Sequence, residues 1–259
     1  MPIELLSGLL RHDRAIALGA LAAVTAAAWV YLLLGAGIGM DMMDMGGGQL
    51  MAMLPEWSPR YAVLIFTMWV VMMAAMMLPS AAPTILLVGA LFRNRSGAVP
   101  GKTALFASGY LLVWCGFSAA ATLLQWGLGE AGLLSETMAL GNAIFASGVL
   151  IAAGVYQWTA LKDTCLTHCR SPAEFLVRHW RPGAFGVVRT GMRHGVFCLG
   201  CCWMLMMLLF VGGLMNLAWV AAIALLVLLE KTIPWGDRMS RLSGAVLAVW
   251  GAASLAQVI

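Results

Sequence analysis

Charged residues are scarce in this sequence. Asp, Glu, Lys and Arg together make up 10% of the 259 residues, whereas hydrophobic residues make up 62%. Soluble domains carry about 25% charged residues, and disordered chains are poor in apolar residues, so both classes are excluded. A helical membrane protein remains. The net charge of +4 requires no nucleic-acid partner, because membrane proteins collect Lys and Arg in their cytoplasmic loops.

The chain also lacks the motifs of several pump and enzyme classes. The full phosphate-binding pattern G-x-x-x-x-G-K-[ST], an Asp-Lys-Thr-Gly phosphorylation motif and the zinc-protease pattern H-E-x-x-H do not occur. ATP-driven pumping by this chain alone and zinc-protease chemistry are therefore not expected. We identify no catalytic residue, and an enzyme is not the favoured class.

Seven apolar runs predict an all-α, polytopic transmembrane bundle that forms one domain over residues 1–259. Each run can cross a ~30 Å hydrocarbon core. The first is longer than a secretory apolar region of roughly 7–15 residues, so we predict a retained span. Pro79 and Pro83 each remove a backbone donor from the second run, which predicts a helix kinked or broken near Leu78. The predicted spans are residues 15–38, 61–91, 103–126, 140–161, 195–215, 217–235 and 243–259.

Basic residues are distributed unevenly among the predicted loops. Fourteen of the 15 Lys and Arg residues fall on the N-terminal side of the membrane, and only Arg60 falls opposite. The positive-inside rule therefore predicts a cytoplasmic N-terminus and, after seven crossings, an external C-terminus, in the inner (cell) membrane. Residues 162–194 form the one sizeable hydrophilic loop, where residues 173–180 predict a short amphipathic surface helix.

Five of the six cysteines fall within 38 positions, in two groups that also contain histidine. If each group is helical, its spacing places the side chains on one face. Both groups are predicted at the cytoplasmic ends of consecutive spans, where thiols stay reduced, and this favours a soft-metal site over disulfides. The alternative is that the cysteines are small apolar packing residues. The candidate ligands are Cys165, His168, Cys169, His194, Cys198, Cys201 and Cys202.

Methionine is unusually abundant, with 19 copies. One group lies in the outer loop after the first span, beside two aspartates and a run of glycines, and another follows an i, i+4, i+8 stripe on the second span. Thioethers bind Cu(I) and have little affinity for hard cations, so both groups are candidate copper ligands. Within the bilayer, gap-filling by methionine is an equal alternative. The candidates are Met40, Met42, Met43 and Met45 in the loop, and Met68, Met72 and Met76 in the span.

Glu230 and Lys231 end the sixth apolar run. An ionisable residue inside a membrane is a functional candidate by default. Near the inner interface, however, a lysine that extends to the headgroups and a glutamate paired with a basic loop residue explain the pair structurally. We favour this structural interpretation slightly. The alternative is that Glu230 and Lys231 act next to the thiols as second-shell partners or proton acceptors.

Residues from about 60 to 235 resemble a family of bacterial integral membrane proteins of unknown function that are described as predicted metal-binding. The resemblance implies metal binding and brings no reaction or substrate. The residues that carry it are Met68-Trp69, Met72, Met73, Met76, Met77 and Pro79; Tyr156, Trp158, Leu161-Lys162, Cys165-Leu166 and Cys169-Arg170; and Gly191, Gly195, Cys198, Gly200-Cys201-Cys202-Trp203-Met204 and Glu230-Lys231.

Three functions are consistent with this pattern. The leading hypothesis is that the protein binds Cu(I) and transfers or transports it between the outer Met-rich loop and the cytoplasmic Cys/His cluster. The second is a membrane metalloenzyme or electron-transfer subunit with copper, iron or an iron–sulfur centre, and the third is an assembly module clamped by zinc. Expected partners are the lipid bilayer and either a metal chaperone or further copies of this chain.

Overall fold

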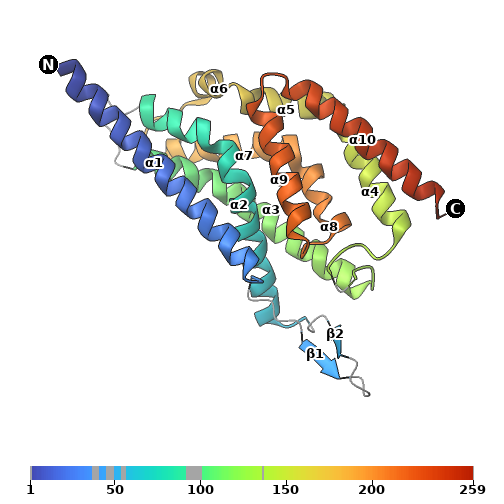
Figure 1. Cartoon of the computed structure of the whole chain (residues 1–259). Helices are drawn as coiled ribbons and strands as arrows, with labels where there is room; N and C mark the ends of the chain where they lie inside the picture. Colours follow the sequence, from blue (N-terminus) through green and yellow to red (C-terminus); the bar gives the residue numbers. More distant parts are fainter. Residues whose placement is uncertain are drawn as a thin grey trace.

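The computed structural model describes residues 2–36, 41–44, 50–53, 57–91, 101–135 and 137–258. Helices dominate these residues, so the predicted all-α class is confirmed (Figure 1). The two short strands, β1 and β2, form an antiparallel pair. The elements are α1 (Pro2–Leu33), β1 (Asp41–Asp44), β2 (Leu50–Met53), α2 (Pro59–Leu91), α3 (Lys102–Glu130), α4 (Ala143–Tyr156), α5 (Ala160–Arg170), α6 (Pro172–His179), α7 (Ala184–Met207), α8 (Leu209–Gly212), α9 (Leu217–Thr232) and α10 (Gly236–Ala256).

Several helices are long and apolar enough to cross a membrane. Among the described residues, five qualify alone, and α4 with α5 qualify as a pair bent by 64°. The predicted fourth span, residues 140–161, is therefore split near its end. Thr159 caps the new helix, because its side chain accepts a hydrogen bond from the backbone N–H of Lys162. Helix α9 has 16 residues and is shorter than each of the five helices that qualify alone. The seven crossings and the sides of the termini stay predictions.

Helix α2 passes through both of its prolines. Of the two predicted alternatives, a kink or a break near Leu78, the break does not occur, because the helix is continuous from Pro59 to Leu91 with Pro79 and Pro83 inside it. It bends along its course instead (Figure 1). Close to the prolines, the carbonyl of Met77 accepts hydrogen bonds from the hydroxyls of Ser80, at 2.9 Å, and Tyr110, at 3.1 Å. These two hydroxyls give the carbonyl of Met77 additional donors close to the bend.

Helices α3 and α7 pack backbone against backbone. A Cβ added at Gly109 would lie 2.1 Å from the carbonyl oxygen of Val188, and one added at Gly191 would lie 2.1 Å from that of Phe106. Small residues allow membrane helices this close approach. As a result, side chains on α3 reach the cysteines of α7.

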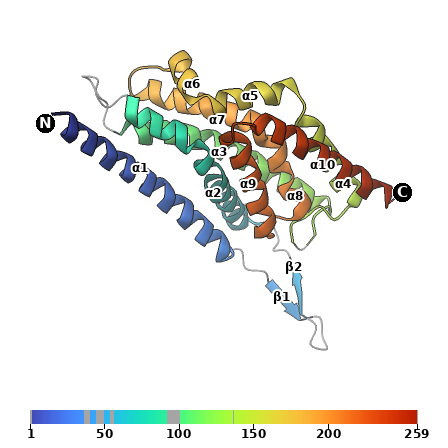
Figure 2. The ribbon, with the colours of Figure 1, turned by 45° about the horizontal axis from the view of Figure 1, so that its top comes forward.

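Helix α9 joins two halves of the bundle. It contacts α2 on one side and α10 on the other, and α10 packs along α4. Helix α1 lies along α2 at the edge of the bundle (Figure 2). The predicted surface helix at residues 173–180 is confirmed as α6, which buries Phe175 and Leu176. The side chains near the end of α9 can therefore face two different environments.

Candidate metal centre

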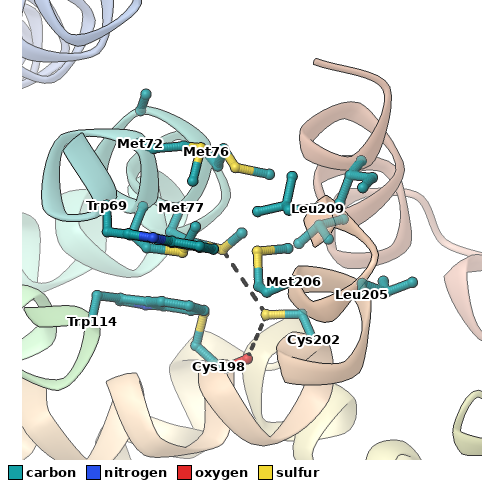
Figure 3. Packing of buried hydrophobic residues seen from close by; sticks show 14 of the residues in the cluster. Trp69, Met72, Met76, Met77, Trp114, Cys198, Cys202, Leu205, Met206 and Leu209 are labelled. Carbon is teal, nitrogen blue, oxygen red and sulfur yellow. Dashed lines mark hydrogen bonds between the residues drawn. The ribbon is translucent and has the colours of Figure 1, made fainter. Parts of the chain in front are cut away.

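A cluster of buried sulfur atoms occupies the contact between α2 and α7 (Figure 3). We call it the sulfur core, and each of its side chains is 1% exposed or less. In Figure 3, Trp69 and Trp114 lie on one side of it, and Leu205 and Leu209 on the other. The i, i+4 stripe on α2 therefore faces the protein interior. The sulfur core consists of Met72, Met76 and Met77 of α2 and Cys198, Cys202 and Met206 of α7.

Cys198 is the most highly connected thiol. Its Sγ lies 2.9 Å from the Nζ of Lys231 and 3.0 Å from the hydroxyl of Tyr110. The Lys231 ammonium also donates to the hydroxyl of Ser80 at 3.2 Å. Among the described residues, Lys231 forms no ion pair with a carboxylate. The nearest group that can carry a compensating negative charge is therefore a thiol.

Cys201 and Cys202 donate their thiol hydrogens back along the helix. Both Sγ atoms bond to the carbonyl of Cys198, at 3.0 and 2.9 Å. The Sγ of Cys202 also lies 4.0 Å from the Sδ of Met77. In the part of the chain that the structure describes, no three His, Cys, Asp or Glu side chains stand in a ready metal-binding arrangement. Side chains with soft donor atoms thus gather here, and the thiols of Cys201 and Cys202 are hydrogen-bonded to the backbone.

Helix α5 brings two further thiols to the same place. The Cys169 thiol lies close to those of Cys198 and Cys201. Cys165 packs on α7 so closely that a Cβ added at Gly200 would lie 2.6 Å from its Sγ. Both cysteines of α5 therefore face the part of α7 that carries Cys198, Cys201 and Cys202, and their joint binding of an ion stays a prediction.

The two candidate histidines behave differently from the cysteines. His168 stacks on Phe197, with ring centres 4.2 Å apart, and its Nδ1 bonds to the carbonyl of Thr164. Cys165, His168 and Cys169 all lie on α5, as expected, and a role of His168 as a metal ligand stays a prediction. His194 is 2% exposed, and its Nδ1 has no hydrogen-bond partner within the described structure. Buried polar atoms are normally paired, so this nitrogen can serve as a donor to an ion.

The start of the helix that carries Cys198 differs from the expectation. The predicted span began at residue 195, which put Cys198 at the mouth of a helix. Helix α7 begins at Ala184, 14 residues before Cys198. At 1.5 Å per residue, Cys198 lies about 21 Å along the helix. The charges of Arg189 and Arg193 favoured a loop in the prediction, although both residues belong to the first turns of α7.

The outer methionines fall largely beyond the described chain. Met40 and Met45 lie outside the described residues. Met42 and Met43 belong to β1, where they stand opposite Ala52 and Met51 of β2. Met68 of α2, the first residue of the predicted stripe, is buried with 2% exposure.

Glu230 belongs to a second buried network. Its Oε2 lies 2.6 Å from the Nζ of Lys162, and its Oε1 accepts from the side chains of Gln157, at 3.1 Å, and Ser243, at 3.2 Å. Lys162 also donates to the amide oxygen of Gln157. This polar network contains Gln157, Lys162, Glu230, Ser240 and Ser243. Glu230 is thus paired with a basic residue, Lys162, as its structural interpretation predicted. The structural interpretation of Lys231 is wrong, because Lys231 points inward and is 8% exposed.

Three residues near the thiols were missed or undervalued by sequence reasoning. Tyr110 and Ser80 carry no metal-ligand signal, and their contacts join helices far apart in the chain. Met77 stood beside the predicted stripe and is the thioether that touches Cys202. The only local signal was the Met76-Met77 pair before Pro79, which placed two thioethers next to a bend.

A family model described as PpoB2, copper chaperone, matches residues 66–254. The match covers α2 from its second turn through nearly all of α10, and so includes both buried networks. No curated protein and no solved structure matches the chain.

Proposed function

Because the chain belongs to the PpoB2 copper chaperone family, we propose that it binds Cu(I) at the sulfur core and passes it along a membrane-spanning path. The observation that carries the proposal is the contact of Cys198, Cys202 and Met77 in one buried site. Thiolates suit Cu(I), zinc and iron–sulfur clusters, and the added thioether favours Cu(I) among these. The family supports copper as the cargo, and the donor set supports its reduced form.

Charge favours Cu(I) at this place. Two thiolates and one Cu(I) ion together carry a single negative charge, and Lys231 carries a single positive charge 2.9 Å from Cys198. A buried charge is costly unless it is paired. Lys231 therefore neutralises the loaded site. A divalent ion such as Zn²⁺ would leave an excess of positive charge with the same two thiolates.

The remaining methionines extend the path along α2. Met68, Met72 and Met76 recur every four residues on its buried side. They span about 12 Å, because each residue adds 1.5 Å. We propose that they hand the ion between Met77 with Cys202 and the end of α2 that follows the Met-rich segment 40–45. On the other side of Cys202, Cys198, Cys201 and Cys169 continue the series of soft donors.

Loading requires a local rearrangement. The thiols of Cys201 and Cys202 are bonded to the carbonyl of Cys198, and Lys231 occupies one side of the Cys198 sulfur. Copper binding has to break the two thiol–carbonyl bonds, and the protons of the ligating thiols leave, while Lys231 stays beside Cys198 as the compensating charge. Side-chain rotation on an intact α7 is sufficient, so the site can fill and empty without unfolding a helix.

A chelator competition tests the site. The purified full chain is titrated with Cu(I) against a chromophoric Cu(I) chelator under reducing conditions. We expect the double variant Cys198→Ser/Cys202→Ser to lose roughly 100-fold or more in affinity, because changes one shell further out already cost about 10–100-fold. The control is Cys115→Ser, whose thiol lies outside the buried core. Equal affinity in the double variant and the control would remove the proposal.

Movement of the ion needs a separate experiment. The protein is reconstituted in vesicles that enclose the chelator, and Cu(I) is added outside. We expect the chelator to colour faster than in empty vesicles, and more slowly with Met72→Leu/Met76→Leu, which shortens the series of thioethers. If binding persists but no ion crosses, the protein stores copper or delivers it on one side only. Metal analysis of protein purified without chelators separates copper from the zinc and iron alternatives.

A further inference from the structure

A cationic pocket lies where α6 and the start of α7 meet, apart from the sulfur core. Its lining contains three arginines and one histidine, and its volume is about 320 Å³. Arg189 and Arg193 are four residues apart on α7 and thus share a face. Arg181 comes from the segment between the two helices. The lining residues are His179, Arg181, Arg189, Thr190, Met192, Arg193 and Val196.

The backbone holds Arg181 against α7. Thr190 accepts a hydrogen bond from the backbone N–H of Arg181 at 3.3 Å, and its hydroxyl lies 3.3 Å from the carbonyl of His179. Thr190 itself is 1% exposed. A Cβ added at Gly186 would lie 2.7 Å from the carbonyl oxygen of Arg181, so the segment packs directly on the first turn of α7. The position of Arg181 is therefore fixed by the fold.

The three arginines have no acidic partner among the described residues. The exposed acids of this region pair elsewhere: Glu174 with Arg178, Asp163 with Arg241, and Asp237 with Arg170. His179 adds no charge of its own near neutral pH, because its pKa is lowered by partial burial and, next, by the charge of Arg193. The pocket therefore concentrates positive charge that no group in the described chain neutralises.

Two apolar side chains of this region are exposed. Val177 on α6 is 84% exposed, and Phe185 on the first turn of α7, which lines a neighbouring pocket with Arg181 and Arg189, is 81% exposed. Side chains of this kind are costly in water and stable among lipid acyl chains. Arginine is the residue best suited to phosphate, because its planar group donates two parallel hydrogen bonds. A phosphate at the membrane surface combines both features.

We infer that Arg181, Arg189 and Arg193 form a binding site for the phosphate of an anionic lipid headgroup. The exposed Val177 and Phe185 enter the acyl region beside it, and the guanidinium groups hold the phosphodiester. The site anchors α6 and the start of α7 to the membrane surface. It involves none of the thiols, so it does not depend on the copper proposal.

The test compares two double variants that remove the same charge. Copper-free full-length protein is titrated with a fluorescent phosphatidylglycerol and, separately, with the matching phosphatidylcholine in detergent. We expect Arg189→Gln/Arg193→Gln to bind phosphatidylglycerol roughly 30-fold more weakly, since each basic residue contributes about a fivefold factor at an anionic surface. The control Arg238→Gln/Arg241→Gln lies on α10 and is expected to bind as the wild type does.

Each outcome decides the inference. Equal weakening in both double variants would show a general charge effect and overturn the site, as would unchanged binding in Arg189→Gln/Arg193→Gln. Inorganic phosphate is added as a competitor. If millimolar phosphate displaces the lipid completely and the two lipids bind alike, free phosphate is the ligand and the lipid assignment fails. Should the double variant aggregate, Arg193→Gln alone is measured, with a fivefold loss expected.

Discussion

Two lysines are buried in this protein, and they have opposite surroundings. Lys162 belongs to the polar network, where Glu230 and Gln157 meet its ammonium and every partner is hydrogen-bonded in turn. Lys231 lies at the sulfur core, where a thiol and a hydroxyl are its contacts. In the polar network, side-chain oxygen and nitrogen atoms satisfy one another by hydrogen bonds. The sulfur core carries a positive charge whose counterpart is sulfur, and it becomes neutral when thiolates are present.

The comparison separates a structural role from a binding role. A buried charge pair whose hydrogen bonds are all satisfied holds helices in one arrangement, and breaking it is costly. A buried ammonium beside thiols favours thiolate, which is the form that binds metal. Two residues adjacent in sequence, Glu230 and Lys231, thus serve different purposes. The variants below test whether the two roles can be separated, in order of decreasing expected effect.

The largest effect is expected when the polar network is broken. Glu230→Gln leaves the ammonium of Lys162, which is 0% exposed, without a counter-charge. Removing one partner of a buried pair costs about 3–5 kcal/mol. We expect this loss in the free energy of unfolding in detergent, measured by denaturant titration. Copper affinity of the folded fraction should stay close to that of the wild type. If this variant kept its stability and lost much of its copper affinity, the polar network would take part in copper binding and the separation of the two roles would be wrong.

The converse variant is Lys231→Met, which keeps the side-chain volume and removes the charge. Replacing a buried ion by an apolar residue of similar size is often neutral for stability, so we expect little change in unfolding. The Cu(I) affinity should fall about 10–100-fold, the range seen for groups that support a ligand. Chelator competition measures it. Unchanged affinity would show that Lys231 does not compensate the loaded site. Lys231→Arg, which keeps the charge, is the matched control.

The smallest effect is expected at the thioether. Met77→Leu preserves the apolar volume and removes the sulfur 4.0 Å from Cys202. Because a neutral thioether contributes less than a thiolate, we expect affinity to fall by less than about tenfold. X-ray absorption at the copper edge should show one sulfur fewer. Met239→Leu on α10 is the control, since this methionine lies outside the sulfur core. An identical copper spectrum in both variants would exclude Met77 from the ligands.

The sequence allowed the helices and the meeting of the cysteines to be predicted, because both follow from periodicity. Cys165 and Cys169 share a face of α5, and Cys198, Cys201 and Cys202 lie along α7. It failed where helix ends depend on tertiary contacts. Arg189 and Arg193 led to a predicted loop where α7 has its first turns, so the start of this helix was predicted too late.

Partners brought in from distant helices were also beyond sequence reasoning. Tyr110 reaches Cys198 only because Gly109 and Gly191 let α3 and α7 touch. Lys231 was expected to extend toward water, since lysines near helix ends usually do so. It turns inward because Cys198 and Ser80 offer it contacts on α7 and α2. Neither contact leaves a pattern in the local sequence.

The adjacency of Glu230 and Lys231 has a mechanical consequence. Consecutive side chains on a helix point about 100° apart. One turn of α9 therefore contacts the bent pair α4–α5 through Glu230 and α7 through Lys231. A rotation of α9 that withdraws Lys231 from the sulfur of Cys198 also pulls Glu230 against Lys162. Copper binding that rotates α9 would then also displace the 64° bend between α4 and α5, because Glu230 and Lys231 are joined by a single peptide bond.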